Sequence, residues 1–377
     1  MNRIRNLLSV CLAIIISISS ASVNAFAETK SSGSSSIETD SINNEEILFV
    51  EKVLPDFLNL EGYFGSEIWV TDSYAVYDLN NSTTIQNKNI YFVFDHDEII
   101  GRLYVDYING QFQANFATIN STVLNDVYNS NSNFIFGIYD KNEIVQCDNI
   151  SVSLSSKKFD LINDLDLIST TNHIEKKTKI RFPDQVNSTL LYNKQLSGIT
   201  WVENEEDFKG NGLCWAATIA MKQMRESGSK NWKNLWAQAV FYNLYMHVKD
   251  DTLPSGNMHW YQIAYPYFEY PNVSYLNSGL ISSGISHALD NNRTIHADLF
   301  RTNKNGTEYI SGHTVLITGM SIYNDHGVYT IYDCNNETSH YSYQWVSPEA
   351  LGNAKKFVYT CPYDSNISYT TWDRTVY

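Results

Sequence analysis

The chain has 377 residues, 43% of them hydrophobic, and a formal net charge of −15 at pH 7. This length exceeds that of one typical domain, and the apolar fraction is ample for folded cores. Phosphate backbones and anionic lipids repel an acidic protein. The composition therefore argues against nucleic acid and membrane surfaces as partners.

The N-terminus has the pattern of a secretory signal peptide at residues 1–27. Two arginines precede an apolar run over 7–18, and Ala25-Phe26-Ala27 offers the small residues of a cleavage site. The apolar run is too short for a comfortable membrane span. We therefore expect a secreted, extracellular protein without a membrane anchor, in which the polar residues 28–44 form a disordered leader.

Residues 45–154 predict a small α+β domain, with one helix on an antiparallel sheet. Apolar residues recur at helical spacing over 47–54, and Pro55 is expected to break that helix. Strand-like alternation continues on both sides of Asn109-Gly110, a strong signal for a two-residue hairpin, and further strands are expected over 134–154. The region shows no group of residues suited to catalysis.

Cys214 stands at the start of an expected helix. A Gly/Asn-rich turn at 210–212 leads into it, Ala217 and Met221 follow at helical spacing, and Gly228 is a C-terminal stop. In the first turn of a helix, unpaired backbone N–H groups and the helix dipole stabilise an anion. Cys214 is therefore a candidate nucleophile, and the alternative is a small core residue at a helix start.

A histidine and an acid on two neighbouring strands complete the candidate site. His313 begins an apolar strand, and the strand over 328–332 leads to Asp333. The turn Asn324-Asp325-His326-Gly327 between them is a hairpin signal, so both side chains are expected on one antiparallel sheet. An imidazole that serves a thiol needs a third group to hold it, and Asp333 or, as the alternative, Asn335 offers one.

These motifs resemble those of secreted bacterial papain-like cysteine peptidases, of the bacteriocin-processing and streptopain or staphopain types. The matching runs are Gly-Leu-Cys-Trp-Ala-Ala, Gly-His-Thr-Val-Leu-Ile-Thr-Gly and Tyr-Thr-Ile-Tyr-Asp, in that order. The likeness spans about residues 195–346. It implies a cysteine endopeptidase in which Cys214 attacks the peptide carbonyl and forms a thioester, His313 transfers protons, and Asp333 orients His313.

The resemblance also implies the fold. We expect an α+β protein with a papain-like catalytic domain at 196–377, built of a helical half and an antiparallel-sheet half, after the small α+β domain. A second helix is expected over 232–247 in the helical half. A polypeptide substrate would lie in the cleft between the halves of a monomer. No zinc-binding spacing is present, so neither a metal nor a cofactor is expected.

The oxyanion hole is where the chain departs from the family pattern. The backbone N–H of Cys214 is one expected donor at the helix start. Papain-like enzymes add a glutamine a few residues before the cysteine, and the stretch 201–209 contains none. Asn204 is the best substitute, and Gln195 lies further from Cys214 in the sequence.

The polar segment 155–195 predicts an exposed linker. It carries basic clusters at Lys157-Lys158 and over 176–181, and such linkers are preferred sites of proteolytic cleavage. Because the domain before it lacks catalytic groups, we expect an intramolecular inhibitory propeptide that is released by cleavage between residues 155 and 200. A permanent N-terminal domain for adhesion or folding is the alternative.

Other functions use the same residue types. Cell-wall amidases of the NlpC or CHAP type also place a cysteine before a histidine, but closer than the 99 residues found here (313 − 214). A non-catalytic secreted binding protein with the same fold, and acyl transfer in place of hydrolysis, stay open. In the exported chain, Cys334 and Cys361 can form a disulfide or stay reduced, and Cys147 has no assigned role.

Overall fold

The computed structural model describes residues 36–63, 67–119, 121–140, 142–147, 150–154, 172–182, 189–204, 214–227, 273–302, 309–360, 368–369 and 371–377. Glu46–Tyr377 form one compact unit, and Met1–Glu45 form another. The expected signal peptide, the expected helix over 232–247 and Cys361 lie outside the described residues. The helices and strands described belong to the unit from Glu46 onward, except that the first helix begins at Ser36.

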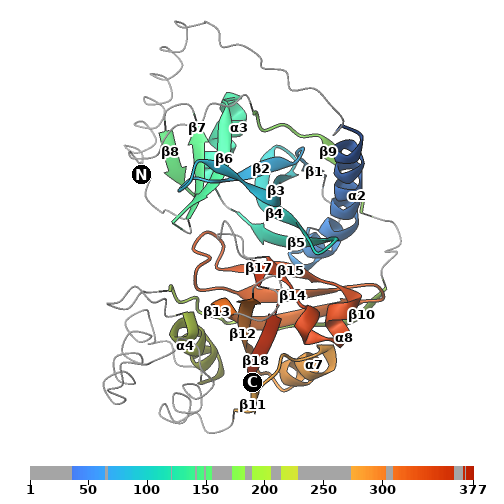
Figure 1. Ribbon diagram of the computed structural model, residues 1–377, viewed down its shortest axis with the longest axis vertical. Coiled ribbons are helices and arrows are strands. Elements are labelled where there is room, and N and C mark those ends of the chain that lie inside the picture. The colour runs from blue at the N-terminus through green and yellow to red at the C-terminus, as the bar shows by residue number, and fades with distance from the viewer. Residues whose placement is uncertain are drawn as a thin grey trace, which may run out of the picture. The chain divides into compact units, whose positions relative to one another are not determined.

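The N-terminal part is a helix followed by strands, with a second helix among them (Figure 1). Its elements are α2 (Ser36–Leu60), β1 (Ile68–Val70), β2 (Tyr74–Asp78), β3 (Thr83–Asp95), β4 (Glu98–Ile108), β5 (Gln111–Thr118), α3 (Thr122–Ser130), β6 (Phe134–Tyr139), β7 (Asn142–Cys147) and β8 (Ile150–Ser153). The described strands of this part pair antiparallel except for the parallel pair of β2 and β6. The hairpin at Asn109-Gly110 is confirmed, since both residues have positive φ and join β4 to β5.

The C-terminal part contains further strands and several helices. Its elements are β9 (Thr178–Lys179), β10 (Leu190–Gln195), α4 (Cys214–Ser227), β11 (Tyr275–Leu276), α7 (Ser282–Asp290), β12 (Ile295–Thr302), β13 (Tyr309–Tyr323), β14 (Gly327–Tyr332), β15 (Tyr341–Val346), α8 (Pro348–Gly352), η1 (Ala354–Lys356), β16 (Tyr359–Thr360), β17 (Ser368–Tyr369) and β18 (Thr371–Val376). The expected helix at Cys214 and the hairpin between β13 and β14 are both confirmed.

One large sheet dominates the described chain and overturns the expected architecture. Among the described residues, 16 strands form a single mixed sheet, in which the central order runs β12-β13-β14-β15-β5-β4-β3. The expectation of a papain-like domain with a helical half and a sheet half, set apart from a small α+β domain, is wrong. The reason is that β15 pairs with β5, which joins the N-terminal strands to those of the C-terminal part.

Helix α2 differs from the expectation at both ends. It starts at Ser36, inside the predicted disordered leader, and it continues through Pro55 to Leu60. A helix extends readily from a packed segment, because elongation needs far less free energy than nucleation. Phe57 and Leu58 are fully buried beyond the proline, and their packing offsets the backbone hydrogen bond that Pro55 removes.

The predicted linker is partly built into the sheet. Strand β9 pairs with β1, and β10 pairs with β13. Ile180, next to β9, is buried, while the neighbouring Lys179 extends over the ring of Trp69. The basic cluster over 176–181 is therefore part of the sheet rather than a free linker, because Ile180 packs in the core while the lysines stay at the surface. Residues 155–171 and 183–188, where the expected cleavage can also fall, lie outside the described residues.

Within the part of the chain that the structure describes, three apolar cores stabilise the sheet. One lies between β12, β13 and β14 and the residues of α7, α8 and η1, around Ile285, Leu289 and Trp372. A second packs α2 on β3, β4 and β5, and a third packs α3 on β3, β4 and β6. The second core also includes Tyr343 and Trp345 of β15, so it extends from the N-terminal part into the C-terminal part.

Helix α4 is held on the sheet by polar as well as apolar contacts. All residues from Trp215 to Met224 are buried. The Thr218 hydroxyl donates to the Thr314 carbonyl at 3.2 Å, and Lys222 Nζ donates to the Thr294 carbonyl and to Glu226 Oε1, each at 2.6 Å. Burial lowers the pKa of Lys222, and Glu226 opposes this shift. These bonds determine where the first residue of α4 lies.

We predict that Lys222→Met destabilises the fold by about 3–5 kcal/mol. The carboxylate of Glu226 is nearly buried, and the substitution takes away the Lys222 ammonium that pairs with it. The double variant Lys222→Met/Glu226→Gln removes both charges and is expected to recover most of the loss. Urea unfolding of the two variants measures the difference. Equal stability of the single and double variants would contradict the prediction.

Candidate active site

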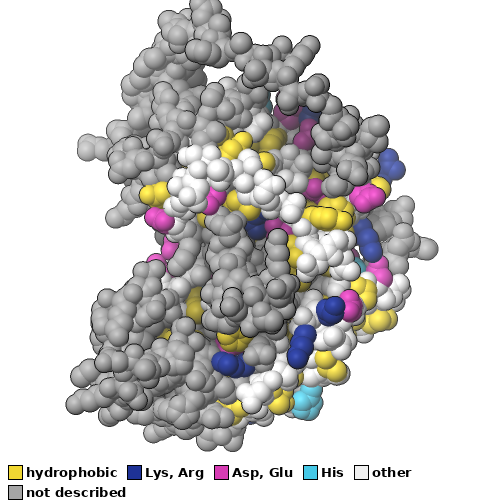
Figure 2. Space-filling view, in the orientation of Figure 1, with side chains coloured by type: hydrophobic (Ala, Val, Ile, Leu, Met, Phe, Trp, Pro, Cys, Tyr) yellow, Lys and Arg dark blue, Asp and Glu magenta, His cyan; other side chains and the backbone are white. Residues whose placement is uncertain are grey.

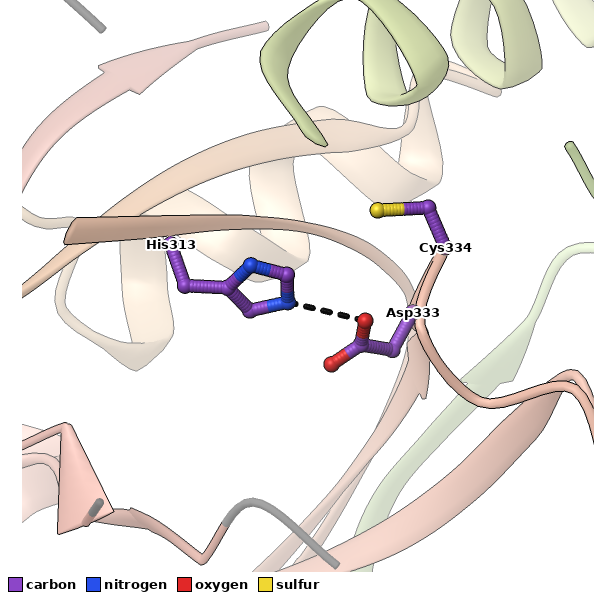
Figure 3. A group of neighbouring side chains, drawn as sticks. All are labelled: His313, Asp333 and Cys334. Atoms are coloured by element: carbon purple, nitrogen blue, oxygen red, sulfur yellow. Dashed lines mark hydrogen bonds and ion pairs between the residues drawn. The ribbon is translucent and has the colours of Figure 1, made fainter. Parts of the chain in front are cut away.

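The candidate catalytic residues come from three elements that the fold brings together. Cys214 is the first residue of α4, His313 lies on β13, and Asp333 directly follows β14. The antiparallel register pairs Leu316 with Tyr332, which brings the residue after β14 close to His313. Figure 3 shows the imidazole of His313 facing the carboxylate of Asp333.

His313 connects the thiol and the carboxylate. Its Nε2 lies 2.8 Å from Asp333 Oδ1, and both side chains are buried. The other ring nitrogen lies on a different side of the ring from Asp333 (Figure 3), and the Cys214 thiol is close enough to the imidazole to act on its pKa. Burial works against the protonated ring, yet the Asp333 charge, its hydrogen bond and Cys214 raise the pKa of His313 to about 10. The ring is therefore an imidazolium at neutral pH.

Three further groups hold Asp333 in place. The Tyr359 hydroxyl donates to Asp333 Oδ2 at 2.8 Å, and the backbone N–H of Asn335 donates to Oδ1 at 2.9 Å. Trp201 Nε1 donates to the Asp333 carbonyl at 2.7 Å. The sequence did not single out Tyr359, which is one of 26 tyrosines and lies in no motif. Trp201 lies in the stretch without a glutamine, and its place at the site follows from its bond to Asp333 and from its stacking on His340, with ring centroids 4.4 Å apart.

Asn204 and Asn335 lie together beside the site. Asn204 Nδ2 donates to Asn335 Oδ1 at 2.6 Å, and the Asn204 backbone N–H donates to the Cys334 carbonyl at 2.9 Å. The side-chain donor of Asn204 is thus engaged with Asn335. Asp333, and not the alternative Asn335, is the residue within hydrogen-bonding distance of His313 Nε2.

The backbone N–H of Cys214 has the helix-start position expected of an oxyanion donor, since α4 begins at that residue. Residues 205–213, which lead into it, lie outside the described residues. Gln195, the weaker candidate donor, lies on β10 and accepts a hydrogen bond from Thr330 at 2.6 Å. Its amide covers Gly319 so closely that a Cβ there would clash with Oε1. Its contacts are those of a packing residue.

Cys334 adds a second thiol next to the candidate triad. His313, Asp333 and Cys334 offer ligand atoms within 4.8 Å of one another, and Cys334 Sγ lies 4.0 Å from the Cys214 carbonyl oxygen. Imidazole, carboxylate and thiolate are zinc ligands, but two ligands at about 2.0 Å from a tetrahedral zinc lie about 3.3 Å apart. The 2.8 Å separation of Nε2 and Oδ1 fits a shared proton better than a shared metal.

The other buried histidines have structural surroundings. His296 Nε2 lies 3.4 Å from Asp298, and burial, opposed by Asp298, lowers the pKa of His296. His326 stacks on Tyr323 and lies between two carboxylates. Both histidines thus lie beside carboxylates within the folded core.

Figure 2 shows the charged side chains of the described residues on one face of the molecule. Acidic and basic side chains of the described residues are interspersed there and do not gather into a patch of one sign. Within the described residues, no helix is both long enough and apolar enough to cross a membrane.

No protein-family model matches the chain, and no curated protein matches it in sequence. The geometry of the candidate site is therefore the basis for inferring the function.

The raised pKa of His313 predicts a pH dependence of stability. The folded-state pKa of about 10 exceeds the unfolded value of 6.5, so the stabilisation is complete below pH 6.5 and is lost as the pH rises to about 10. We expect the unfolding free energy of the wild type to fall through this window more steeply than that of His313→Gln, by at most about 1.4 kcal/mol per pH unit. Urea unfolding at several pH values measures how the free energy of unfolding changes with pH. Equal slopes for the wild type and His313→Gln would contradict a raised pKa of His313.

Proposed function

We propose that the protein is a cysteine hydrolase that cleaves peptide bonds, with Cys214 as nucleophile, His313 as proton carrier and Asp333 as the residue that orients His313. The observation that carries the proposal is the position of His313, 2.8 Å from a buried carboxylate and near enough to the helix-start thiol of Cys214 for the thiol to act on the pKa of the ring. The motif resemblance to secreted bacterial cysteine peptidases supports the same chemistry. The proposal concerns the chemistry of the site and does not include a papain-like architecture.

The first half of the reaction forms a thioester. The Cys214 thiolate, paired with the His313 imidazolium, attacks the carbonyl carbon of the scissile bond, and the carbonyl oxygen becomes an oxyanion. The backbone N–H of Cys214 stabilises this charge. When the C–N bond breaks, His313 gives its proton to the departing amine, and the acyl group stays on Cys214.

The second half releases the acid. Neutral His313 takes a proton from water, and the resulting hydroxide attacks the thioester carbonyl. The C–S bond breaks, the acid product leaves, and the Cys214 thiolate and the His313 imidazolium form again. Asp333 keeps its proton count throughout, because its role is to orient the ring and to stabilise its positive charge. Tyr359 and Asn335 hold the carboxylate for that role.

Secretion and proteolytic processing belong to the proposal as expectations. The signal peptide is a pattern of residues 1–27, and the cleavage region includes 155–171 and 183–188, all outside the described residues. Analysis of the secreted protein by mass spectrometry would show both cleavages. A polypeptide is the proposed substrate, and a monomer is the proposed active form.

We predict that an epoxide inhibitor of cysteine peptidases labels Cys214 and abolishes hydrolysis of an unfolded protein substrate. Cys214→Ala removes labelling and activity together, whereas Cys147→Ser, in β7, is a matched control that keeps both. Mass spectrometry of the labelled peptide identifies the residue. Hydrolysis that persists in Cys214→Ala, or a folded wild type that neither labels nor hydrolyses before and after linker cleavage, would contradict the proposal.

A further inference from the structure

The N-terminal part joins the C-terminal part through a continuous strand pair. Strand β15 lies antiparallel to β5, with Tyr343 opposite Phe116 and Gln344 opposite Asn115. Phe57 of α2 stacks on the Phe116 ring, and Tyr343 stacks on both rings. We call this pairing of β5 with β15, together with the side chains around it, the junction. It is buried and apolar, like the inside of a single domain.

Buried hydrogen bonds cross the junction toward the active site. Asn115 Nδ2 donates to Ser342 Oγ at 2.9 Å and to Gln344 Oε1 at 3.2 Å. Gln344 Oε1 also accepts from the Thr360 backbone N–H at 3.2 Å and from the Thr360 hydroxyl at 2.9 Å. Asn115, Ser342, Gln344 and Thr360 are all fully buried. Asn115 of the N-terminal part thereby fixes the position of β16.

Strand β16 carries the side chain that holds the triad acid. Tyr359, the residue before Thr360, is fully buried and donates to Asp333 Oδ2 at 2.8 Å. Asp333 in turn contacts His313 Nε2 through its other oxygen. A displacement of β16 would therefore move the Tyr359 hydroxyl away from Asp333 and loosen the support of His313.

Contacts at the β13–β14 turn anchor the junction at a second place. His326 Nε2 lies 3.0 Å from Asp56 Oδ2 of α2, and both side chains are buried. Lys52, also on α2, forms an ion pair with Asp325 at 2.7 Å. Separation of the two parts would leave Asp56 and His326 without each other and would expose Tyr343 and Trp345 to water. Interfaces with apolar cores of this kind are typical of permanent association.

We propose that the N-terminal part, from Glu46 to Ser153, stays bound in the active protein and positions Asp333 through Asn115, Gln344, Thr360 and Tyr359. The catalytic importance of this positioning rests on the proposed function, whereas the positioning itself does not. Cys214 is only half-buried while the N-terminal part is in place. A permanently bound N-terminal part has to leave the nucleophile accessible in this way. Cleavage of the linker then produces two chains that stay together, and not a released inhibitor.

Asn115→Leu tests the positioning role, because it keeps the approximate volume of the side chain and removes both donors. The matched control is Asn89→Leu, since Asn89 Nδ2 donates to Glu46 within the N-terminal part. The measurement is NMR titration of ¹³C-labelled histidine in the full chain, with His313→Gln to assign the signal. We expect His313 to titrate near pH 10 in the wild type and in Asn89→Leu, and lower by about one pH unit in Asn115→Leu.

Linker cleavage tests the permanence. A specific protease site is inserted within 155–171 of the full chain, the purified protein is cut, and the two fragments are followed by size exclusion in non-denaturing buffer. We expect the fragments to elute together and Cys214 to react with the epoxide at the rate of the uncut chain. Separation of the N-terminal fragment with faster labelling of Cys214 would overturn the proposal in favour of a removable inhibitor.

The two measurements also separate this inference from the proposed function. Neither uses a peptide substrate, so fragments that stay together and a His313 signal that depends on Asn115 support the positioning role even in a protein that cleaves no peptide. An unchanged His313 titration in folded Asn115→Leu would contradict the positioning role even in an active peptidase.

Discussion

A buried carboxylate 2.8 Å from His313 Nε2 determines both the charge and the orientation of the imidazole beside Cys214. Without Asp333, burial would favour the neutral ring, and the thiol would lose its cationic partner. The chemistry proposed for Cys214 therefore depends on the position of one oxygen atom. Tyr359, Asn335 and Trp201, which bond to Asp333, matter for the same reason.

The sheet couples this site to distant parts of the chain. His313 lies on β13, which pairs with β10, β12 and β14, so its backbone has ladder partners along most of its length. Cys214 depends on the buried Thr218 and Lys222 bonds that seat α4 on the strands. Asp333 depends on the turn after β14 and on β16, which the N-terminal strands support. The three residues are thus held by three different segments, and each segment is fixed by buried polar bonds.

Local features of the fold followed from the sequence where a short-range physical rule applies. The positive φ angles at Asn109-Gly110, the hairpin before β14 and the helix from Cys214 each depend on neighbouring residues, and the structure has all three. Long-range pairing has no such rule. Asn115 and Gln344 lie 229 positions apart, and nothing in either strand specifies the other as its partner. The expected two-part architecture was wrong for this reason.

The candidate site, like the fold, was predictable from the sequence only where short-range signals exist. Cys214, His313 and Asp333 were singled out because helix starts, strand starts and hairpins leave signals in the sequence. Tyr359 was missed because its role arises from the pairing of distant strands, and a tyrosine in no motif carries no signal of a carboxylate partner. Pro55 was judged by its local effect on a helix, whereas the burial of Phe57 and Leu58 decides the outcome.

The central claim is that Cys214 forms the covalent intermediate. The most direct measurement is mass spectrometry of the full chain after incubation with an N-acyl amino acid p-nitrophenyl ester and quenching in acid, which preserves a thioester. The account predicts an acyl group on Cys214 that appears with the first equivalent of p-nitrophenol and disappears with time. Release of p-nitrophenol with no acyl group on Cys214, or with the acyl group on Cys334, would contradict it.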